Sequence, residues 1–533
     1  MPWAARSSFL CLGAYVAVLG GTPAGPGAPA VQHDAAIRSV VAGQVASGDI
    51  SGDLAARFSV FLTTGQFATI VVAHTGVDIV IRQPHADPLR QIVTASDGPD
   101  GEIRLPVYAD VSEPLTFEVA AAYPKTARGT YAFRLVDVRE ATALDRQVAE
   151  GQRLHSQAVH LRGSDAFVAA GARAREALVV REKALGNVAC DTARSLLLLG
   201  QIEDAAANFN GADADYLRAR RIVEGSFGSH ELLRAQILDS HGSNLIARGK
   251  YREAEPLVRE ALATRERILG PSHPLVAAST ATLADFHHES ANVQEAFKAA
   301  QRALETAAGV YRPTDIVFGD FLNRVARSEL AMGNYARAEQ LYRESLEVRE
   351  KNSGVSNLAV ADSLGGLARV ALLTNDNAAA EERHLQSLSI RERVLGPDHP
   401  QVANDVFNLG LISYRRRDFP TALTRYGRAL AIREKTFGRI HPVIALTVNN
   451  LGLVYWRQSD YPRAEEFFGR ALDLSEQLYG PDSLRVTNPL GNLGIMAKEQ
   501  GHYGLAETRY RRALAIKEKH LGPDHPELIV LVE

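Results

Sequence analysis

Residues 408–438 read NLGLISYRRRDFPTALTRYGRALAIREKTFG, and residues 450–480 return as NLGLVYWRQSDYPRAEEFFGRALDLSEQLYG, 42 positions later. The Leu-Gly pair, an aromatic residue, two alanines and the closing glycine keep their register. A period of about 20 to 50 residues is typical of stacked supersecondary units, none of which buries its apolar face alone. The chain is therefore predicted to be a repeat array with a long binding surface.

The closing glycine recurs every 42 residues, with one exception at Arg312. The glycines are Gly186, Gly228, Gly270, Gly354, Gly396, Gly438, Gly480 and Gly522. An alanine follows 26 positions after each repeat position, at Ala212, Ala254, Ala296, Ala338, Ala380, Ala422, Ala464 and Ala506. Another small residue follows two helical turns later; these are Ala219, Ala261, Ala303, Ser345, Ser387, Ala429, Ala471 and Ala513. Small residues at this spacing predict a crowded crossing between two helices.

Bulk composition excludes some classes of partner. The chain has 533 residues, of which 46% are hydrophobic and 23% charged, which is ordinary for soluble proteins. Its formal net charge is −3, so no global positive field attracts nucleic acid. We expect no nucleic-acid partner.

Residues 1–30 have the layout of a secretory signal peptide. A single positive charge, Arg6, precedes an apolar stretch at 8–19, and small residues follow at 22–24 and 28–30. We expect an exported, periplasmic or secreted protein without membrane insertion after cleavage; an uncleaved membrane anchor is the alternative. Cys190 is then the only cysteine of the mature chain, which excludes an internal disulfide.

Residues 31–140 are expected to form an all-β sandwich. Six runs of strand length, rich in β-branched and aromatic residues, are separated by turn signals such as Thr64-Gly65 and Arg128-Gly129. The runs are 56–62, 68–72, 77–81, 103–107, 115–119 and 131–136. With Thr64-Gly65-Gln66-Phe67 opening one strand and Gly129-Thr130-Tyr131 before the last, the segment resembles jelly-roll domains that follow signal peptides in bacterial exported proteins.

Residues 141–533 are expected to form an all-α superhelical solenoid of about nine repeats, the last incomplete. Each repeat has a helix A and a helix B, joined by a turn whose glycine, where present, supplies the left-handed conformation that ends a helix. Gly249, Gly333 and Gly501 are such glycines. Because Ala291 and Asn375 stand in their place, and Arg312 replaces a closing glycine, we expect local irregularity in the middle repeats.

The repeats resemble the tetratricopeptide repeats of kinesin light chain. The resemblance is carried by the Leu-Gly pairs 409–410, 451–452 and 493–494, the Arg470-Ala471-Leu472 run, and the Leu-Gly-Pro-Asp-His-Pro sequence at 395–400. In that family the A helices line a concave groove that binds extended peptides. The resemblance thus implies a non-enzymatic scaffold that binds a peptide or protein partner.

The resemblance also implies particular binding residues. Asn408, Asn450 and Asn492 occupy the place from which the family's asparagines hold the ligand main chain, and Asn449 is adjacent. A carboxamide both donates and accepts hydrogen bonds, as a peptide backbone requires. The equivalent earlier positions are Ser240, Thr282, Arg324 and Gly366. The alternative is that the asparagines satisfy each other or water.

Other polar motifs are given structural interpretations. His273, His399, His441 and His525 each precede a proline, but they recur once per repeat and so cannot converge on one metal ion. Proline at the start of a helix, with Asp398 or Asp524 as a cap, explains them. Arg-Glu-Lys and Arg-Glu-Arg triplets near the ends of the B helices are interpreted as a solvated outer face. No catalytic residue, cofactor or metal ligand is predicted.

The end of the sequence leaves a second function open. Residues 526–533 begin another helix A with apolar residues, and we expect the natural gene to continue beyond Glu533 or the chain to be a fragment. Bacterial proteins with a similar sandwich and repeats often end in a caspase-like peptidase domain, the CHAT domain. The alternative function is therefore the sensing arm of a truncated multidomain enzyme. Carbohydrate binding by the sandwich is a third hypothesis, based on fold analogy.

Overall fold

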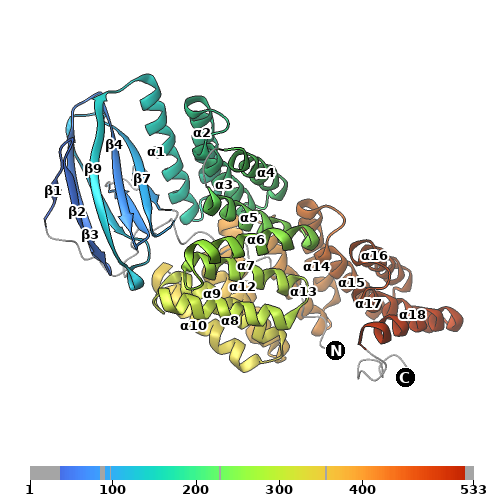
Figure 1. The fold of residues 1–533 in the computed structure, drawn as a ribbon. Coiled ribbons are helices and arrows are strands. Elements are labelled where there is room, and N and C mark those ends of the chain that lie inside the picture. The colour runs from blue at the N-terminus through green and yellow to red at the C-terminus, as the bar shows by residue number, and fades with distance from the viewer. Residues whose placement is uncertain (1–35, 85–90, 97, 227–229, 354–356, 522–533) are drawn as a thin grey trace. The chain divides into compact units, whose positions relative to one another are not determined.

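The computed structural model describes residues 36–84, 91–96, 98–226, 230–353 and 357–521 (Figure 1). The predicted signal peptide (1–30) and the apolar run at 526–533 lie outside these residues. The described chain divides into two compact units, of which the first ends at Gly366 and the second begins at Leu367. Among the helices of the described ranges, none is both long and apolar enough to cross a membrane.

The N-terminal strands form two sheets around a single core (Figure 1). One sheet has the order β1-β3-β8-β5-β6, and its strands are β1 (Arg38–Ser39), β3 (Ala55–Leu62), β8 (Glu113–Ala121), β5 (Ile79–Gln83) and β6 (Ile92–Ala95). The other has the order β2-β9-β4-β7, and its strands are β2 (Val45–Ser51), β9 (Arg128–Glu140), β4 (Gln66–Thr75) and β7 (Gly101–Tyr108). Described neighbours pair antiparallel except for the parallel pair β1 and β3.

The predicted β-sandwich is confirmed, and alternating side chains explain its core. Phe58 on β3 stacks on Phe133 on β9, in the opposite sheet, with 4.2 Å between the ring centroids. Both rings are fully buried because they stand on the inward face of strands whose next residues point outward. The six predicted runs overlap β3, β4, β5, β7, β8 and β9. Strands β1, β2 and β6 were missed because they are short or, like β2 with its sequence VASGDIS, lack an apolar alternation.

Nine helix pairs follow in the described chain, which confirms the predicted solenoid (Figure 1). The A helices are α1 (Ala143–Gly163), α3 (Cys190–Ala205), α5 (Glu231–Ala247), α7 (Pro274–Glu289), α9 (Ile316–Ala331), α11 (Leu358–Leu373), α13 (Pro400–Arg415), α15 (Pro442–Arg457) and α17 (Thr487–Glu499). The B helices are α2 (Phe167–Leu185), α4 (Phe209–Gly225), α6 (Tyr251–Leu269), α8 (Val293–Val310), α10 (Tyr335–Ser353), α12 (Asn377–Leu395), α14 (Phe419–Phe437), α16 (Tyr461–Tyr479) and α18 (Tyr503–Leu521). The small residues predicted at the crossings, such as Ala254 and Ala422, are buried.

The turn from helix A to helix B has the same backbone conformation in every described repeat. One residue per turn has a positive φ between 59° and 88°, at Asp165, Ala207, Gly249, Ala291, Gly333, Asn375, Arg417, Ser459 and Gly501. Ala291 and Asn375 therefore adopt the conformation that glycine adopts elsewhere. The irregularity expected at these two turns is not found, because the packing of the two helices imposes the left-handed residue.

Replacing Ala291 by glycine is expected to stabilise the fourth repeat by about 1 kcal/mol, because glycine has no Cβ to oppose a positive φ. Gly333→Ala is the reverse substitution and serves as the control. Gly333 has a φ of 88°, and a Cβ added there would have no atom within 4 Å, so the substitution changes only the backbone strain. Thermal unfolding followed by circular dichroism measures both variants. Shifts of the same sign would contradict the strain argument.

The repeated histidines cap the A helices. Nδ1 of His273, His399 and His441 accepts a hydrogen bond from the backbone N–H two residues later, at 3.1 to 3.3 Å, and a proline follows in the first turn. The expectation that Asp398 caps is wrong, since Asp398 instead pairs with Lys435. Where the chain is described, no three His, Cys, Asp or Glu side chains group closely enough to hold a metal ion.

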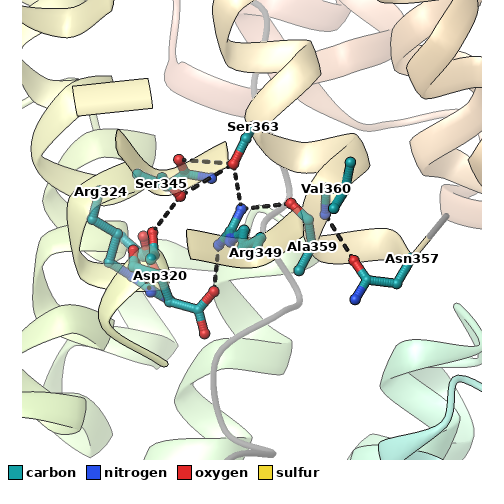
Figure 2. Close-up of polar contacts among 11 residues, drawn as sticks. Asp320, Arg324, Ser345, Arg349, Asn357, Ala359, Val360 and Ser363 are labelled. Atoms are coloured by element: carbon teal, nitrogen blue, oxygen red, sulfur yellow. Dashed lines mark hydrogen bonds and ion pairs between the residues drawn. The ribbon is translucent and has the colours of Figure 1, made fainter. Parts of the chain in front are cut away.

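Buried arginines connect successive repeats, as Figure 2 shows for Arg349. This side chain leaves α10, forms an ion pair with Asp320 on α9, and donates to the Ala359 carbonyl and the Ser363 hydroxyl on α11 at 2.6 and 2.9 Å. It thus links both helices of one repeat to helix A of the next. Ser345 completes the cluster by donating to the Gly319 carbonyl.

Equivalent arginines occupy the first place of the Arg-Glu-Lys and Arg-Glu-Arg triplets, and each is at most 3% exposed: Arg181, Arg265, Arg349, Arg391 and Arg433. Each donates to a side chain 14 residues later, at Ser195, Ser279, Ser363, Asp405 and Thr447. The interpretation as a solvated face is therefore wrong for this residue. Where the arginine is replaced by Val223 or Ala307, the residue 14 positions later is the apolar Ile237 or Phe321.

The second residue of the triplets does face outward. Glutamates at this place pair with an arginine 36 residues later, on the next helix B; the pairs are Glu182–Arg218, Glu266–Arg302, Glu392–Arg428 and Glu434–Arg470. Both partners are partly exposed, so each pair contributes less than about 1 kcal/mol. The triplet thus combines a buried and a solvated position.

Candidate peptide-binding face

The A helices form the inner row of the first unit. Neighbouring A helices from α1 to α9 approach one another more closely than neighbouring B helices do. The B helices are instead bridged by long Arg–Glu pairs such as Arg218–Glu182. A stack in which one set of helices is closer together curves toward that set, so the side chains of the A helices line the concave side.

The four predicted asparagines lie on A helices of the second unit. Asn408 is on α13, Asn449 and Asn450 are on α15, and Asn492 is on α17. Asn408 and Asn450 are buried, at 3% and 4% exposure, whereas Asn449 and Asn492 are half-buried. Although Asn408, Asn450 and Asn492 occupy the same position in successive repeats, their side chains therefore differ in burial.

The hydrogen bonds of these asparagines also differ. Asn492 Nδ2 donates to Asn449 Oδ1 at 2.8 Å, which joins α17 to α15. Asn450 Nδ2 donates at 2.9 Å to the Leu446 carbonyl, one turn earlier on its own helix. Asn408 Nδ2 is buried and has no hydrogen-bond partner within the described ranges. The structure thus brings Asn449 and Asn492 together and leaves the amide of Asn408 unsatisfied.

In the first unit, two of the equivalent positions, Ser240 and Arg324, are paired across the A helices. Gln201 Nε2 on α3 donates to Ser240 Oγ on α5 at 3.0 Å, and Arg324 on α9 donates to Asp285 on α7 at 3.0 Å. In each pair the residue on the later helix stands where the asparagines stand, and its partner precedes it by 39 positions. Arg327 also pairs with Asp285. Sequence reasoning missed these pairs, although their polar residues recur at fixed places on helix A.

The same spacing explains the asparagines of the second unit. The residues 39 positions before Asn408, Asn450 and Asn492 are Arg369, Leu411 and Leu453. Leucine cannot accept a hydrogen bond, and arginine can only donate. None of the three equivalent residues supplies an acceptor. Among the described residues, the amide of Asn408 therefore has no partner, Asn450 donates within its own helix, and Asn492 finds its cross-helix acceptor in Asn449 instead.

Buried polar groups lie below the inner row of the first unit. Asp204 accepts hydrogen bonds from the Tyr216 hydroxyl at 2.7 Å and from Asn244 Nδ2 at 2.6 Å. Burial raises the pKa of Asp204 to about 7, although these donors oppose the shift. Arg162, which donates to Gln201 on the row, has its pKa lowered to about 10 by burial. Asp204 thus finds its donors within the first unit, whereas Nε of Arg162 is buried without a hydrogen-bond partner among the described residues.

A serine, a histidine and an aspartate meet in the second unit, at Ser387, His384 and Asp405. His384 Nδ1 contacts Asp405 Oδ1 at 2.9 Å, and Ser387 Oγ donates to Asp405 Oδ2 at 2.9 Å. In a catalytic triad the serine would instead contact the other histidine nitrogen and face a substrate. All three side chains are fully buried. Arg391 completes the cluster, and although burial opposes it, Arg391 and His384 lower the pKa of Asp405. The geometry is that of a structural ion pair.

Comparison with known protein families identifies the helical part of the chain. A sequence profile described as tetratricopeptide repeat matches residues 233–308, 319–393, 376–435 and 443–519, together just over half of the chain. A second profile with the same description matches residues 407–478. Among curated proteins, none matches the chain significantly.

Several solved structures are similar at low identity. BtubC (BKLC) from P. vanneervenii is 24% identical with a TM-score of 0.36, over 44% of this chain and 92% of that protein. A Rap protein complexed with competence and sporulation factor is 16% identical with a TM-score of 0.45, over 61% and 98%. A putative kinesin light chain from Podosopora anserina is 17% identical with a TM-score of 0.34, over 39% and 98%.

Proposed function

The chain belongs to the tetratricopeptide repeat family, whose members serve as protein-interaction scaffolds, and we propose that this one binds an extended peptide segment of a protein partner along the A helices of its second unit. The observation that carries the proposal is the buried amide of Asn408, which has no hydrogen-bond partner among the described residues. A carboxamide without a protein acceptor can donate to a peptide carbonyl and accept from a peptide N–H.

The burial of Asn408 supports a binding role. A buried amide without a partner costs about 1 to 3 kcal/mol, which a bound backbone carbonyl would recover. The Asn449–Asn492 bond supplies further polar side chains on the A helices of the second unit. The resemblance to kinesin light chain repeats points to the same side chains. In this proposal the protein is exported and has no catalytic role; the alternative role as the sensing arm of a longer enzyme requires an open reading frame beyond Glu533.

A random peptide library selected against the mature chain tests the proposal. Peptides that bind are measured against the variant Asn408→Ala/Asn450→Ala/Asn492→Ala and against Gln201→Ala/Ser240→Ala, a control on the A helices of the first unit. We expect the triple variant to lose at least about tenfold in affinity, as two lost hydrogen bonds imply, and the control to lose none.

The helicity of both variants is compared with the parent by circular dichroism before binding is measured. Equal binding by the parent and the triple variant would move the site away from the asparagines. A larger loss in the control would place the site in the first unit.

A further inference from the structure

The repeat position without a glycine follows a different backbone path. Where the glycine is present and described, as at Gly270 and Gly396, it follows helix B with a φ near 80°. After α8, Tyr311 is the C-cap with a φ of −94°, and Arg312 is not among the residues with positive φ. Glycine is therefore not required here, and the altered path directs two large side chains out of the repeat.

Both side chains contact the β-sandwich. Arg312 forms an ion pair with Asp53, in the turn between β2 and β3, and both groups are about one-third exposed. The Tyr311 ring meets Tyr123 edge to face, with 6.0 Å between centroids. Lys125, beside Tyr123, donates to the Tyr311 carbonyl at 3.2 Å and to the Ala308 carbonyl at the C-terminal end of α8. A positive charge at that end of a helix is favourable.

A second contact joins the sandwich to the start of α7. His273 uses Nδ1 to cap this helix, so Nε2 carries the proton and donates to Asp78 Oδ2 at 3.0 Å. The Tyr123 ring packs edge to face on His273 at 5.8 Å. Tyr123 is 7% exposed and lies between His273 and Tyr311. One aromatic side chain of the sandwich therefore fills the space between two inter-repeat connections.

The sandwich also contacts the first repeat. Ser156 on α1 accepts from the Val93 N–H at 3.2 Å and donates to the Val93 carbonyl at 3.3 Å, on strand β6. The Arg146 guanidinium lies over the Tyr108 ring at 5.6 Å. One folded domain thus contacts α1, the start of α7 and the connection after α8.

We propose that the β-sandwich is an internal brace that restrains the stacking of the first four repeats, and that Arg312 replaces the repeat glycine in order to form this contact. In a solenoid each repeat otherwise contacts only its neighbours, so small changes at each interface accumulate along the stack. A domain fixed at repeat 1 and again after repeat 4 removes that freedom. The brace holds the inner row of the first unit in its self-paired arrangement, independently of any ligand.

Replacing Arg312 by the glycine of the other repeats tests the proposal. A return to the repeat consensus should stabilise the structure, whereas the loss of a brace contact should loosen it. Consensus substitutions commonly stabilise, whereas the brace predicts that Arg312→Gly loosens the docked sandwich. Hydrogen exchange followed by mass spectrometry on the full chain measures both. We expect exchange to rise at least about fivefold at 119–127 and at 273–278, with no change at 400–437 in the second unit.

Two controls separate docking from folding. The charge-exchanged variant Asp53→Arg/Arg312→Asp should restore protection that either single reversal removes. His273→Gln should raise exchange at 119–127, whereas His399→Gln, which removes the same kind of cap from α13, should leave that segment unchanged. Unchanged or slower exchange in Arg312→Gly, or equal effects of the two histidine variants at 119–127, would overturn the proposal.

Discussion

Replacing Arg265 by methionine is expected to destabilise α5, α6 and α7 by about 3 to 5 kcal/mol, because it leaves a buried carboxylate without its cation. Arg265 is 1% exposed and Asp239 is fully buried, with 2.9 Å between Nη1 and Oδ2. Arg265 also donates to Ser279 at 2.6 Å, so the change removes a link to the next repeat. Native-state hydrogen exchange of these helices measures the loss.

Arg433→Met is the matched comparison. Arg433 is equally buried, but it donates to the neutral groups of Thr447 at 2.6 Å and Asn404 at 3.0 Å, and burial lowers its pKa to about 9. Its loss leaves no charge behind and should cost about 1 to 3 kcal/mol. Equal losses in the two variants would show that the buried charge of Asp239 is not what Arg265 stabilises.

The pH dependence of the Arg265→Met variant gives a second measurement. Burial raises the pKa of Asp239 even beside Arg265, and without the guanidinium the pKa rises further. A raised pKa means that the folded state binds a proton where the unfolded state does not, so the variant gains stability as the pH falls toward the unfolded pKa near 4. The difference in stability between the variant and the parent should therefore shrink as the pH is lowered toward about 4.

The 42-residue period was sufficient to predict the solenoid, because each helix crossing requires a small residue and small residues recur at that spacing along the chain. It did not reveal which charges are buried. The triplet Arg433-Glu434-Lys435 looks uniformly solvated, and the burial of Arg433 depends on Thr447, 14 residues further on. Helical amphipathicity is local, whereas the partner of a buried charge is supplied by the next helix.

In the candidate site, too, the sequence predicted the positions of the residues but not their contacts. The sequence located Asn408, Asn450 and Asn492 at one place on successive A helices, as the structure has them. It did not separate them by environment, because the neighbouring Asn449 takes the contact with Asn492. The pairing of Asp285 with Arg324 was missed because its spacing of 39 residues is three residues shorter than the repeat period, a little less than one helical turn. Contacts between successive A helices depend on how far one helix is shifted along the other in the stack, and the repeat period alone does not show this shift.

Phe468→Ala is expected to destabilise α15, α16 and α17 by about 3 to 5 kcal/mol, because the ring fills the crossing between two helices. Phe468 is 1% exposed, and a Cβ added to Gly452 would lie 2.7 Å from its ring. Glycine therefore lets the aromatic ring rest directly on the backbone of helix A. The same arrangement recurs at Gly200–Tyr216, Gly410–Tyr426 and Gly494–Tyr510.

Two substitutions show whether the ring or its general hydrophobicity matters in this crossing. Phe468→Tyr keeps the ring and should cost about 1 kcal/mol, because the equivalent Tyr426 hydroxyl is buried without a described hydrogen-bond partner. Tyr503→Ala removes a ring that is 71% exposed and should change stability by less than about 0.5 kcal/mol. Urea unfolding followed by circular dichroism ranks the three variants. A Phe468→Ala loss no larger than that of Tyr503→Ala would show that the helices close over the empty space, and that the glycine is not kept for the ring.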